Sequence, residues 1–319
     1  MPAPLPRLDR QNLMTSTASS VEEWRHLVAQ SFVPLMTEAP ARTSFQGTMR
    51  SRSWDRTSVV EISADGHEVH RTPGLIERSD QRYFKLNVQL EGAGFLVQGN
   101  REAVLQPGNM AVYDTTKPYS LVFERHARVV VVMFPHDALT LPPDLVGQLS
   151  AVRMASSQGI AGIVGPFIRQ MAENLSALEG PSGARLASSA LELVATMLHS
   201  ELDEHRDAMT PHALLLASVH DYIEANLGDP SLSPASIAAA HFISTRHLHH
   251  LFQDSGTTVA SWIRHQRLER TARDLRDPLQ TGKPVSSIAN RWGFVDAAHF
   301  SRAFRDAYGQ SPSSWKSAA

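Results

Sequence analysis

The 319-residue sequence contains no cysteine. This absence excludes disulfide bonds, zinc sites built on thiolates and a catalytic cysteine nucleophile, and it is typical of a protein from a reducing cytosol. The sequence also lacks an apolar run of about 18 residues, the length needed to cross a membrane, and its first residues do not resemble a signal peptide. We therefore expect a cytoplasmic protein with no membrane partner.

Charge is scarce as well, since only 19% of the residues are charged whereas 42% are hydrophobic. This is the composition of a chain that forms a core, and its length predicts two domains. The net charge of -2 is unevenly distributed: from His212 onward, 11 Lys and Arg face 9 Asp and Glu, and eight of the 15 histidines lie there. A mildly basic C-terminal part is compatible with nucleic-acid binding, but so small an excess does not decide it.

The N-terminal part changes from an irregular segment to a β pattern. Residues 1–19, rich in Pro, Ser and Thr, predict a mobile arm, and the capping-box spacing of Ser20 and Glu23 predicts a short helix after it. From about residue 43 the pattern has period two, as in residues 84–90, which alternate like a half-buried strand. With turn signals such as Gly99-Asn100, these short strands predict a jelly-roll or cupin-like β-barrel.

A helical pair follows the barrel in the sequence. Residues 160–178 and 184–205 predict two helices, separated by Gly180-Pro181-Ser182-Gly183. The second helix carries an apolar stripe formed by Leu186, Ala190, Leu193, Met197, Leu198 and Leu202. This stripe packs either on the barrel or on another subunit, and the sequence leaves both alternatives open. We therefore expect residues 20–205 to form a barrel plus a helical pair for dimerisation, and residues 206–211 to form a linker.

Residues 212–319 predict an all-helical domain in which two segments share one layout. In the first, residues 236–240 predict a short helix, and Ser244 caps the next helix. In the second, residues 285–289 predict the short helix, Gly293 supplies the turn, and another helix follows. This layout is that of a helix-turn-helix, although the first copy has Phe242 in the turn and no glycine.

The segment between the two copies predicts a single helix from about residue 258 to 276. At about 1.5 Å per residue, such a helix is near 30 Å long. One turn of B-DNA is about 34 Å, so a stiff connector of this length can place two recognition helices in successive major grooves. This match is a stronger indication of DNA binding than the small positive charge.

The C-terminal motif resembles a known family. The run from Gly293 to Trp315, GFVDAAHFSRAFRDAYGQSPSSW, together with the first unit, is similar to the DNA-binding domain of AraC/XylS-family transcription regulators. Residues 71–123 resemble the barrel-shaped effector domain of a subgroup that regulates aromatic, nitrile and amine breakdown. The resemblance implies an α+β protein: a dimeric, ligand-responsive activator of a catabolic or stress operon that acts on double-stranded DNA and with RNA polymerase. It implies no enzyme activity, no cofactor and no metal.

The same resemblance points to the residues that read DNA. Base edges would be read from Arg246, His249 and His250 in the first recognition helix and from Ala297, Ala298, His299 and Arg302 in the second. Arg302 is the strongest candidate, because a guanidinium can bind guanine O6 and N7 in bidentate fashion. Phosphate contacts, which position a protein without specifying sequence, are expected from Thr245, Ser301 and Arg305.

The barrel leaves two hypotheses to weigh. An effector pocket that suits an aromatic or acidic small molecule is expected from Arg78, Tyr83, Phe95, Gln98, Tyr113 and Tyr119. The alternative is a cupin-type metalloenzyme, suggested by His67-Glu68-Val69-His70. The His-x-x-His spacing opposes it, because in a strand these two side chains point to opposite faces.

Overall fold

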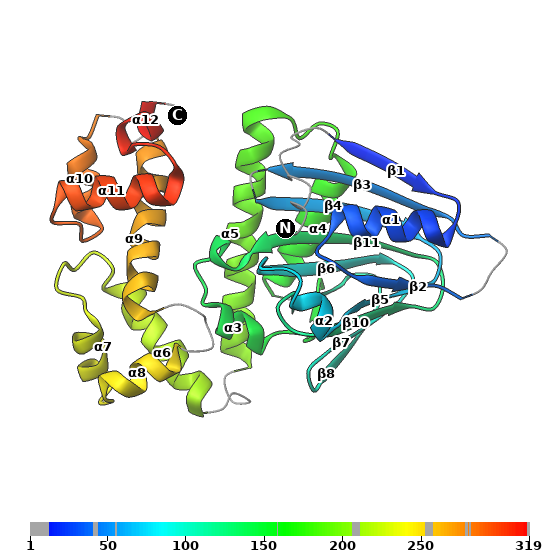
Figure 1. Cartoon of the computed structure of the whole chain (residues 1–319), viewed down its shortest axis with the longest axis horizontal. Coiled ribbons are helices and arrows are strands. Elements are labelled where there is room, and N and C mark those ends of the chain that lie inside the picture. The colour runs from blue at the N-terminus through cyan, green and yellow to red at the C-terminus, as the bar shows by residue number, and fades with distance from the viewer. Residues whose placement is uncertain are drawn as a thin grey trace. The chain divides into compact units, whose positions relative to one another are not determined.

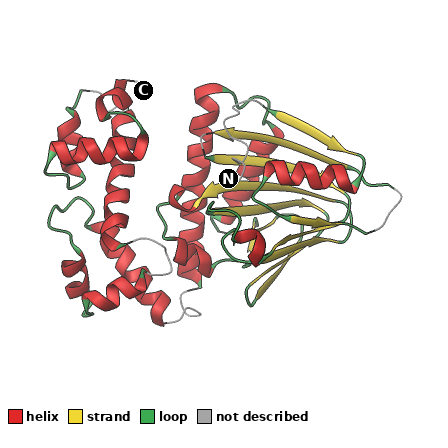
Figure 2. Cartoon of the chain, in the orientation of Figure 1, coloured by secondary structure: helices red, strands yellow, loops and turns green. Residues whose placement is uncertain are grey.

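Two structural units, Met1–Ala208 and Met209–Ala319, make up the chain in the computed structural model (Figure 1). The structure describes residues 13–40, 44–54, 56–157, 159–205, 211–252, 258–277, 280 and 282–317. All described strands belong to the first unit, whereas the described elements of the second unit are helices (Figure 2). The chain is therefore of the α+β class, as the sequence predicts.

The first unit contains two antiparallel sheets that face each other across one apolar interior. The larger sheet has the order β1-β3-β4-β11-β6-β9-β12, and the smaller has the order β2-β5-β10-β7-β8. The strands of the larger sheet are β1 (Met14–Ala18), β3 (Gly47–Trp54), β4 (Thr57–Ala64), β6 (Tyr83–Glu91), β9 (Asn109–Asp114), β11 (Ala127–Pro135) and β12 (Met154–Ala155). Those of the smaller are β2 (Met36–Glu38), β5 (His67–Arg71), β7 (Gly94–Gln98), β8 (Arg101–Leu105) and β10 (Tyr119–Phe123).

Helix α1 (Val21–Ser31) contributes side chains to the interior between the sheets. It begins where the sequence predicts, because the Ser20 hydroxyl accepts a hydrogen bond from the Glu23 backbone N–H at 3.2 Å. Trp24 and Val28 point from it into the interior cluster and are buried. A Cβ at Gly47 would lie 2.6 Å from the Trp24 ring, so glycine at this position lets β3 pass close to the helix.

The mobile arm predicted for residues 1–19 is wrong in its last part. Met14–Ala18 forms strand β1, which pairs with β3 from Met14↔Ser51 to Ala18↔Gly47. Thr15 and Thr17 are residue types that suit a strand, and the ladder with β3 satisfies their backbone groups. The first twelve residues of that predicted arm lie outside the described residues.

Helices cover the outer face of the larger sheet. α4 (Ala161–Glu173) packs on β4, β6 and β11, and α5 (Gly180–Glu204) packs on β3 and on α4. Short helices α2 (Pro73–Ile76) and α3 (Pro143–Gln148) and a 3₁₀ turn at His136–Ala138 complete the unit. The predicted interruption at Gly180–Gly183 is corrected: these residues form the first turn of α5, where the missing N–H of Pro181 breaks no helical hydrogen bond.

The structure also corrects the half-buried strand predicted for residues 84–90. All of β6 from Tyr83 to Gln89 is buried, because α4 covers its outer face and the smaller sheet faces its inner side. Phe84 stacks on His136 at a centroid distance of 4.1 Å, outside the interior cluster. Lys85 points the other way, into the interior beside Tyr119. The alternation in the sequence is correct, but the polar side chains face inward.

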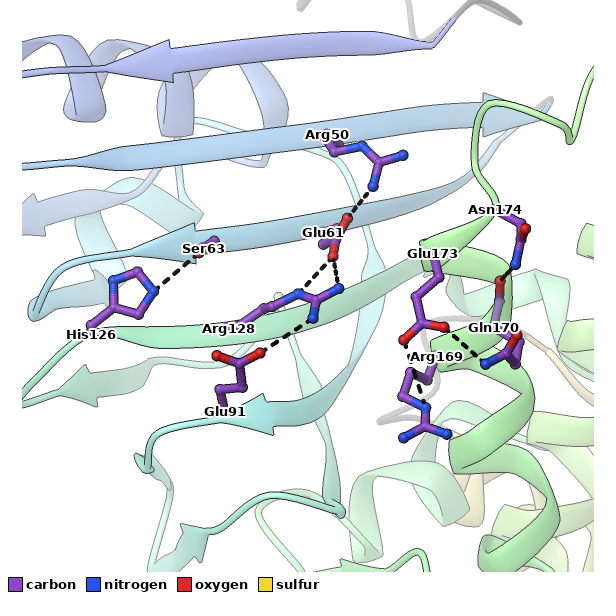
Figure 3. A network of polar contacts seen from close by, with 10 residues as sticks. All are labelled: Arg50, Glu61, Ser63, Glu91, His126, Arg128, Arg169, Gln170, Glu173 and Asn174. Carbon is purple, nitrogen blue, oxygen red and sulfur yellow. Dashed lines mark hydrogen bonds and ion pairs between the residues drawn. The ribbon is translucent and has the colours of Figure 1, made fainter.

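A polar network lies on the outer face of the larger sheet. Glu61 on β4 is 6% exposed and accepts hydrogen bonds from Arg50 on β3 at 2.8 Å and from Arg128 on β11 at 2.6 and 2.8 Å (Figure 3). Arg128 also reaches Glu91 at 3.3 Å. The buried carboxylate is thus paired with two guanidinium groups, which offset its desolvation.

The second unit is a chain of seven helices that the structure describes. They are α6 (Pro211–Ala225), α7 (Pro234–Ala240), α8 (Thr245–Leu251), α9 (Val259–Arg276), α10 (Val285–Arg291), α11 (Ala297–Tyr308) and α12 (Pro312–Ser317). Ser233, Ser244 and Thr258 cap α7, α8 and α9 with their hydroxyl groups, which confirms the cap predicted at Ser244. The predicted linker at residues 206–211 lies, apart from its last residue, outside the described residues.

Candidate DNA-reading helices and effector pocket

The turns of the two helix-turn-helix units have the same backbone conformation. Gly293 has φ +77°, and Phe242 at the corresponding position of the first unit has φ +55°. In each turn, the backbone N–H groups of this residue and of the following residue donate to carbonyls of the preceding helix. The accepting carbonyls are those of Ala239 and Ala238 in the first unit and those of Asn290 and Ala289 in the second. The missing glycine therefore does not change the motif, although a left-handed Phe costs about 1–2 kcal/mol.

Helix α8 separates its buried residues from those predicted to read bases. Leu248 and Leu251 are buried, as is Phe252 at its C-terminal end. Arg246, His249 and His250 are exposed. The core residues hold the helix, and the three predicted base-reading side chains lie on its exposed side.

Helix α11 shows the same separation and begins with a charged cap. The Asp296 carboxylate accepts from the backbone N–H groups of Ala298 and His299 at 2.8 and 2.9 Å, and these hydrogen bonds hold its pKa below the ordinary value. We call α6, α7, α8 and the N-terminal part of α9 the first lobe of the second unit, and α10, α11, α12 and the C-terminal part of α9 its second lobe. Phe300 and Phe304 are buried in the second lobe. The residues predicted to read bases, which are Ala297, Ala298, His299 and Arg302, are all exposed.

The residues predicted to contact phosphates differ in their availability. Thr245 and Arg305 are exposed. Ser301 is half-buried, and its hydroxyl donates to the Ala297 carbonyl at 2.8 Å, so a phosphate contact would require that bond to be given up. Thr245 and Arg305 are therefore the better candidates.

The connector predicted between the two units is α9, an 18-residue helix. Its length is about 27 Å at about 1.5 Å per residue. Its N-terminal part enters the first lobe, where the Trp262 ring lies 5.2 Å from His220. Its C-terminal part enters the second, where Leu268 and Leu275 join the aromatic cluster of α11. One continuous helix thus belongs to both cores.

Arg267, at the middle of α9, ties the lobes together in a way that the sequence does not reveal. Its guanidinium donates to the backbone carbonyls of Leu227 at 2.9 Å and Asp229 at 2.6 Å, both after α6. It also donates to the carbonyl of Gly293 at 3.3 Å, in the turn before α11. The side chain therefore couples the first lobe to the second reading helix.

A cavity lies in the interior between the two sheets of the first unit. Its lining combines aromatic and aliphatic side chains with two titratable groups that the sequence analysis did not single out for a pocket, His67 and Lys85. The other lining residues are Trp24, Val28, Phe32, Leu35, Ile62, Val69, Tyr113, Tyr119, Leu121, Phe123, Val129 and Val131. A mostly apolar cavity with a few polar groups has the character of a small-molecule site.

Two of the residues expected in an effector pocket line this cavity, and four do not. Tyr113 and Tyr119 line it, with their rings 4.8 Å apart. Tyr83 is buried in the same interior cluster but is not among the lining residues.

Three of those expectations need a structural correction. Phe95 is 36% exposed and lies on the outward side of β7. Gln98 is buried, but its amide is committed to the backbone N–H and C=O of Asp114, at 2.8 and 2.7 Å. Arg78 is exposed after α2. Their positions follow from strand register and loop geometry, which composition alone does not define.

Lys85 was missed because its alternating strand suggested that polar residues face solvent. The side chain is 2% exposed and its Nζ donates to the Tyr119 hydroxyl at 3.2 Å. Burial, and to a lesser degree the positive charge of Arg71, lower the pKa of Lys85 to about 7. One signal in the sequence could have revealed the position of Lys85. Helices are predicted after the strands, and if a helix buries the apolar face of a strand, the polar face of that strand must turn inward.

The geometry of β5 opposes the metalloenzyme alternative. His67 is buried in the interior, whereas His70 is half-buried on the other face, where it contacts Ser120 and Glu68. Within the part of the chain that the structure describes, no three His, Cys, Asp or Glu side chains form a group that could hold a metal ion. No helix of that part is both long and apolar enough to span a bilayer.

Comparison with known proteins agrees with this architecture. Residues 24–199 match the family described as AraC-binding-like domain, and residues 237–318 match a helix-turn-helix domain. The transcriptional activator NphR of a Rhodococcus species is 32% identical over 273 residues, which cover 85% of this chain and 81% of NphR. The arabinose operon regulatory protein of Escherichia coli K12 is 34% identical over 96 residues, 30% of this chain and 32% of that protein.

A solved structure has a similar fold over most of this chain. The AraC-like transcriptional activator CuxR covers 87% of this chain and 100% of its own, with a TM-score of 0.53 at 17% identity. An effector-type barrel followed by two helix-turn-helix units defines a DNA-binding transcription regulator. The chain belongs to the AraC/XylS family of transcription regulators.

Proposed function

We propose that this chain is a ligand-responsive transcriptional activator that binds two successive major-groove segments through each subunit. The observation that carries the proposal is the coupling of two similar reading units through α9 and Arg267. This coupling favours simultaneous contact by both units, because a connector of about 27 Å approaches the length of one turn of B-DNA. The similarity to NphR, named a transcriptional activator, supports activation, which requires RNA polymerase as a further partner.

Within this proposal, exposed side chains of α8 and α11 read the bases. Arg302 takes the central part, because its guanidinium can form two hydrogen bonds to one guanine. Ala297 and Ala298 offer only methyl groups, which suit contact with a thymine methyl. Thr245 and Arg305 bind phosphates and fix the register of the helices on the duplex.

Regulation is proposed to proceed by a shift between conformations of a cytoplasmic homodimer. A ligand in the barrel cavity would stabilise the arrangement in which both subunits place their reading helices on adjacent sites, as at a catabolic or stress operon. α4 and α5 are the proposed dimer surface, since Ile163 is 63% exposed and Leu186 is 38% exposed there. Most of the stripe predicted on α5, including Ala190, Met197 and Leu198, instead packs within the subunit.

Hydroxyl-radical footprinting of the full-length protein on DNA from beside its own gene tests this proposal. Each subunit should protect two groups of backbone positions, spaced by about one helical turn of 10–10.5 base pairs. The Arg302→Ala variant should lose protection in the group that α11 contacts more than in the group that α8 contacts. A single protected turn per subunit, or equal loss in both groups, would contradict the proposed reading mode.

A further inference from the structure

Lys85 is a buried lysine that lines the barrel cavity and has few polar partners. Its Nζ lies 3.2 Å from the Tyr119 hydroxyl oxygen and 4.2 Å from the centroid of the Phe32 ring. Among the described residues no carboxylate forms an ion pair with it. An ammonium group has three N–H donors, and the Tyr119 hydroxyl accepts one of them. A buried amine with so few polar partners takes up its proton only at a cost, and an anion beside it would lower that cost.

The groups around Lys85 leave it as the anchor for an anion. Burial raises the pKa values of Tyr113 and Tyr119, so both phenols stay protonated and neutral. His67 is also neutral, because burial lowers its pKa and its Nδ1 donates to the Asp65 carbonyl at 2.8 Å. Arg71 contributes positive charge. Its Nε and Nη1 donate to the carbonyls of Thr115, Pro34 and Leu75, whereas its buried Nη2 has no hydrogen-bond partner among the described residues.

The remaining walls of the cavity fit an apolar ligand body. Trp24, Phe32 and Phe123 supply aromatic surface, and aliphatic side chains from α1, β4, β5, β10 and β11 line much of the remainder. The cavity therefore combines one end that carries Lys85 with a long apolar wall.

We infer that the cavity binds a small monocarboxylate with an aromatic or apolar body. The carboxylate accepts hydrogen bonds from the Lys85 ammonium and from the Tyr119 hydroxyl, whose own hydrogen is not used in its bond with Lys85. The body packs against Trp24 and Phe32, which belong to α1 and its C-terminal end. The inference rests on the proposed function only in taking this ligand as the effector.

Calorimetric titration of the full-length protein tests the ligand class. The probes are benzoate, phenylacetate, 3-phenylpropionate and hexanoate, each compared with its uncharged primary amide. At least one carboxylate should bind about 10- to 100-fold more tightly than its amide, since a hydrogen bond to a charged group accounts for such a ratio. Equal affinity for acid and amide, or no binding of any of the four acids at millimolar concentration, would overturn the inference.

Two variants assign the effect to Lys85. Lys85→Met keeps the length of the side chain and removes the charge, and it should abolish the preference for the acid while binding the amide as before. Lys117→Met, a change at an exposed lysine, is the matched control and should behave like the parent protein. If Lys85→Met retains the preference for the acid, the anchor lies elsewhere.

The number of protons taken up on ligand binding distinguishes an anchoring lysine from a purely structural one, which would not change its protonation. An anion that requires the ammonium form must raise the pKa of Lys85, so binding at about pH 8 takes up close to one proton. Titrations in two buffers with different ionisation enthalpies measure this uptake, and the affinity should fall about tenfold per pH unit above pH 7. Absence of proton uptake would contradict the inference.

DNA binding by the Lys85 variant separates the proposed ligand site from the proposed function. Lys85→Met should bind DNA from beside the gene as tightly as the parent protein in the absence of ligand. Loss of ligand selectivity with intact DNA binding supports the site, whereas intact selectivity in a protein that reads no DNA would refute the proposed function alone.

Discussion

Replacing Gly293 with alanine should loosen the second reading unit more than its backbone strain explains. The residue has φ +77°, a conformation that costs an alanine about 1–2 kcal/mol. A Cβ would also lie 2.7 Å from the Cζ of Arg267 and 2.8 Å from its Nη2. The guanidinium would have to move, and its hydrogen bonds to the carbonyls of Leu227, Asp229 and Gly293 would weaken.

The chain offers a matched control at the end of α11. Gly309 has φ +71°, and no atom lies within 4 Å of a Cβ built there. Gly309→Ala should therefore cost about 1–2 kcal/mol from strain alone. Gly293→Ala should cost about 2 kcal/mol more, since hydrogen bonds to a charged group contribute about 1.5–3 kcal/mol and a side chain at the surface recovers part of this through water.

Native-state hydrogen exchange read by mass spectrometry separates the two effects in the full-length chain. Protection of α10 and α11 should fall further in Gly293→Ala than in Gly309→Ala, with β6 and β11 unchanged. In the background Arg267→Ala, the extra cost of Gly293→Ala should disappear. Equal losses in the two glycine variants would refute the reasoning, because the contact with Arg267 would then contribute nothing.

Three further predictions concern charge. The pKa of Lys85, about 7 in the folded state against 10.5 unfolded, means that stability rises by about 2 kcal/mol from pH 7 to 9; Lys85→Met should remove this rise in urea titrations. The pKa of buried His220, about 3 against 6.5, means that stability falls by about 2 kcal/mol from pH 6.5 to 4.5, and His220→Phe should abolish this fall. In DNA-binding titrations, Arg302→Ala should cost about 1–3 kcal/mol of binding free energy on the specific site and relax the preference at one base pair, whereas Arg305→Ala should weaken binding to all DNA alike. The control Arg125→Ala should change neither the affinity nor the preference. Equal losses of affinity for specific and random DNA in Arg302→Ala would contradict the role of Arg302.

Local signals in the sequence predicted the helical unit well. Ser233, Ser244 and Thr258 start their helices as capping residues because the hydrogen bond from a side chain to the first turn depends only on nearby residues. The apolar spacing likewise separated the buried Phe300 and Phe304 from exposed Arg302. These features need no knowledge of distant contacts.

The effector pocket was harder to predict because it depends on contacts distant in the sequence. The pattern of residues 84–90 predicts alternation, but which side faces the interior is decided by α4, about 75 residues later in the chain. For this reason Lys85 was missed, and Phe95 was assigned to a pocket from which it points away. Arg267 was missed for a related reason, since its three carbonyl partners lie in two separate turns.

Fluorescence anisotropy on DNA from beside the gene tests the central claim most directly. The full-length protein would be titrated against that fragment and a scrambled fragment of equal length, over a series of salt concentrations. Sequence-specific reading predicts affinity for the genomic fragment at least about 10³ tighter than for the scrambled one, with the ratio maintained as salt rises. Equal binding to both fragments that weakens in parallel with salt would contradict the account.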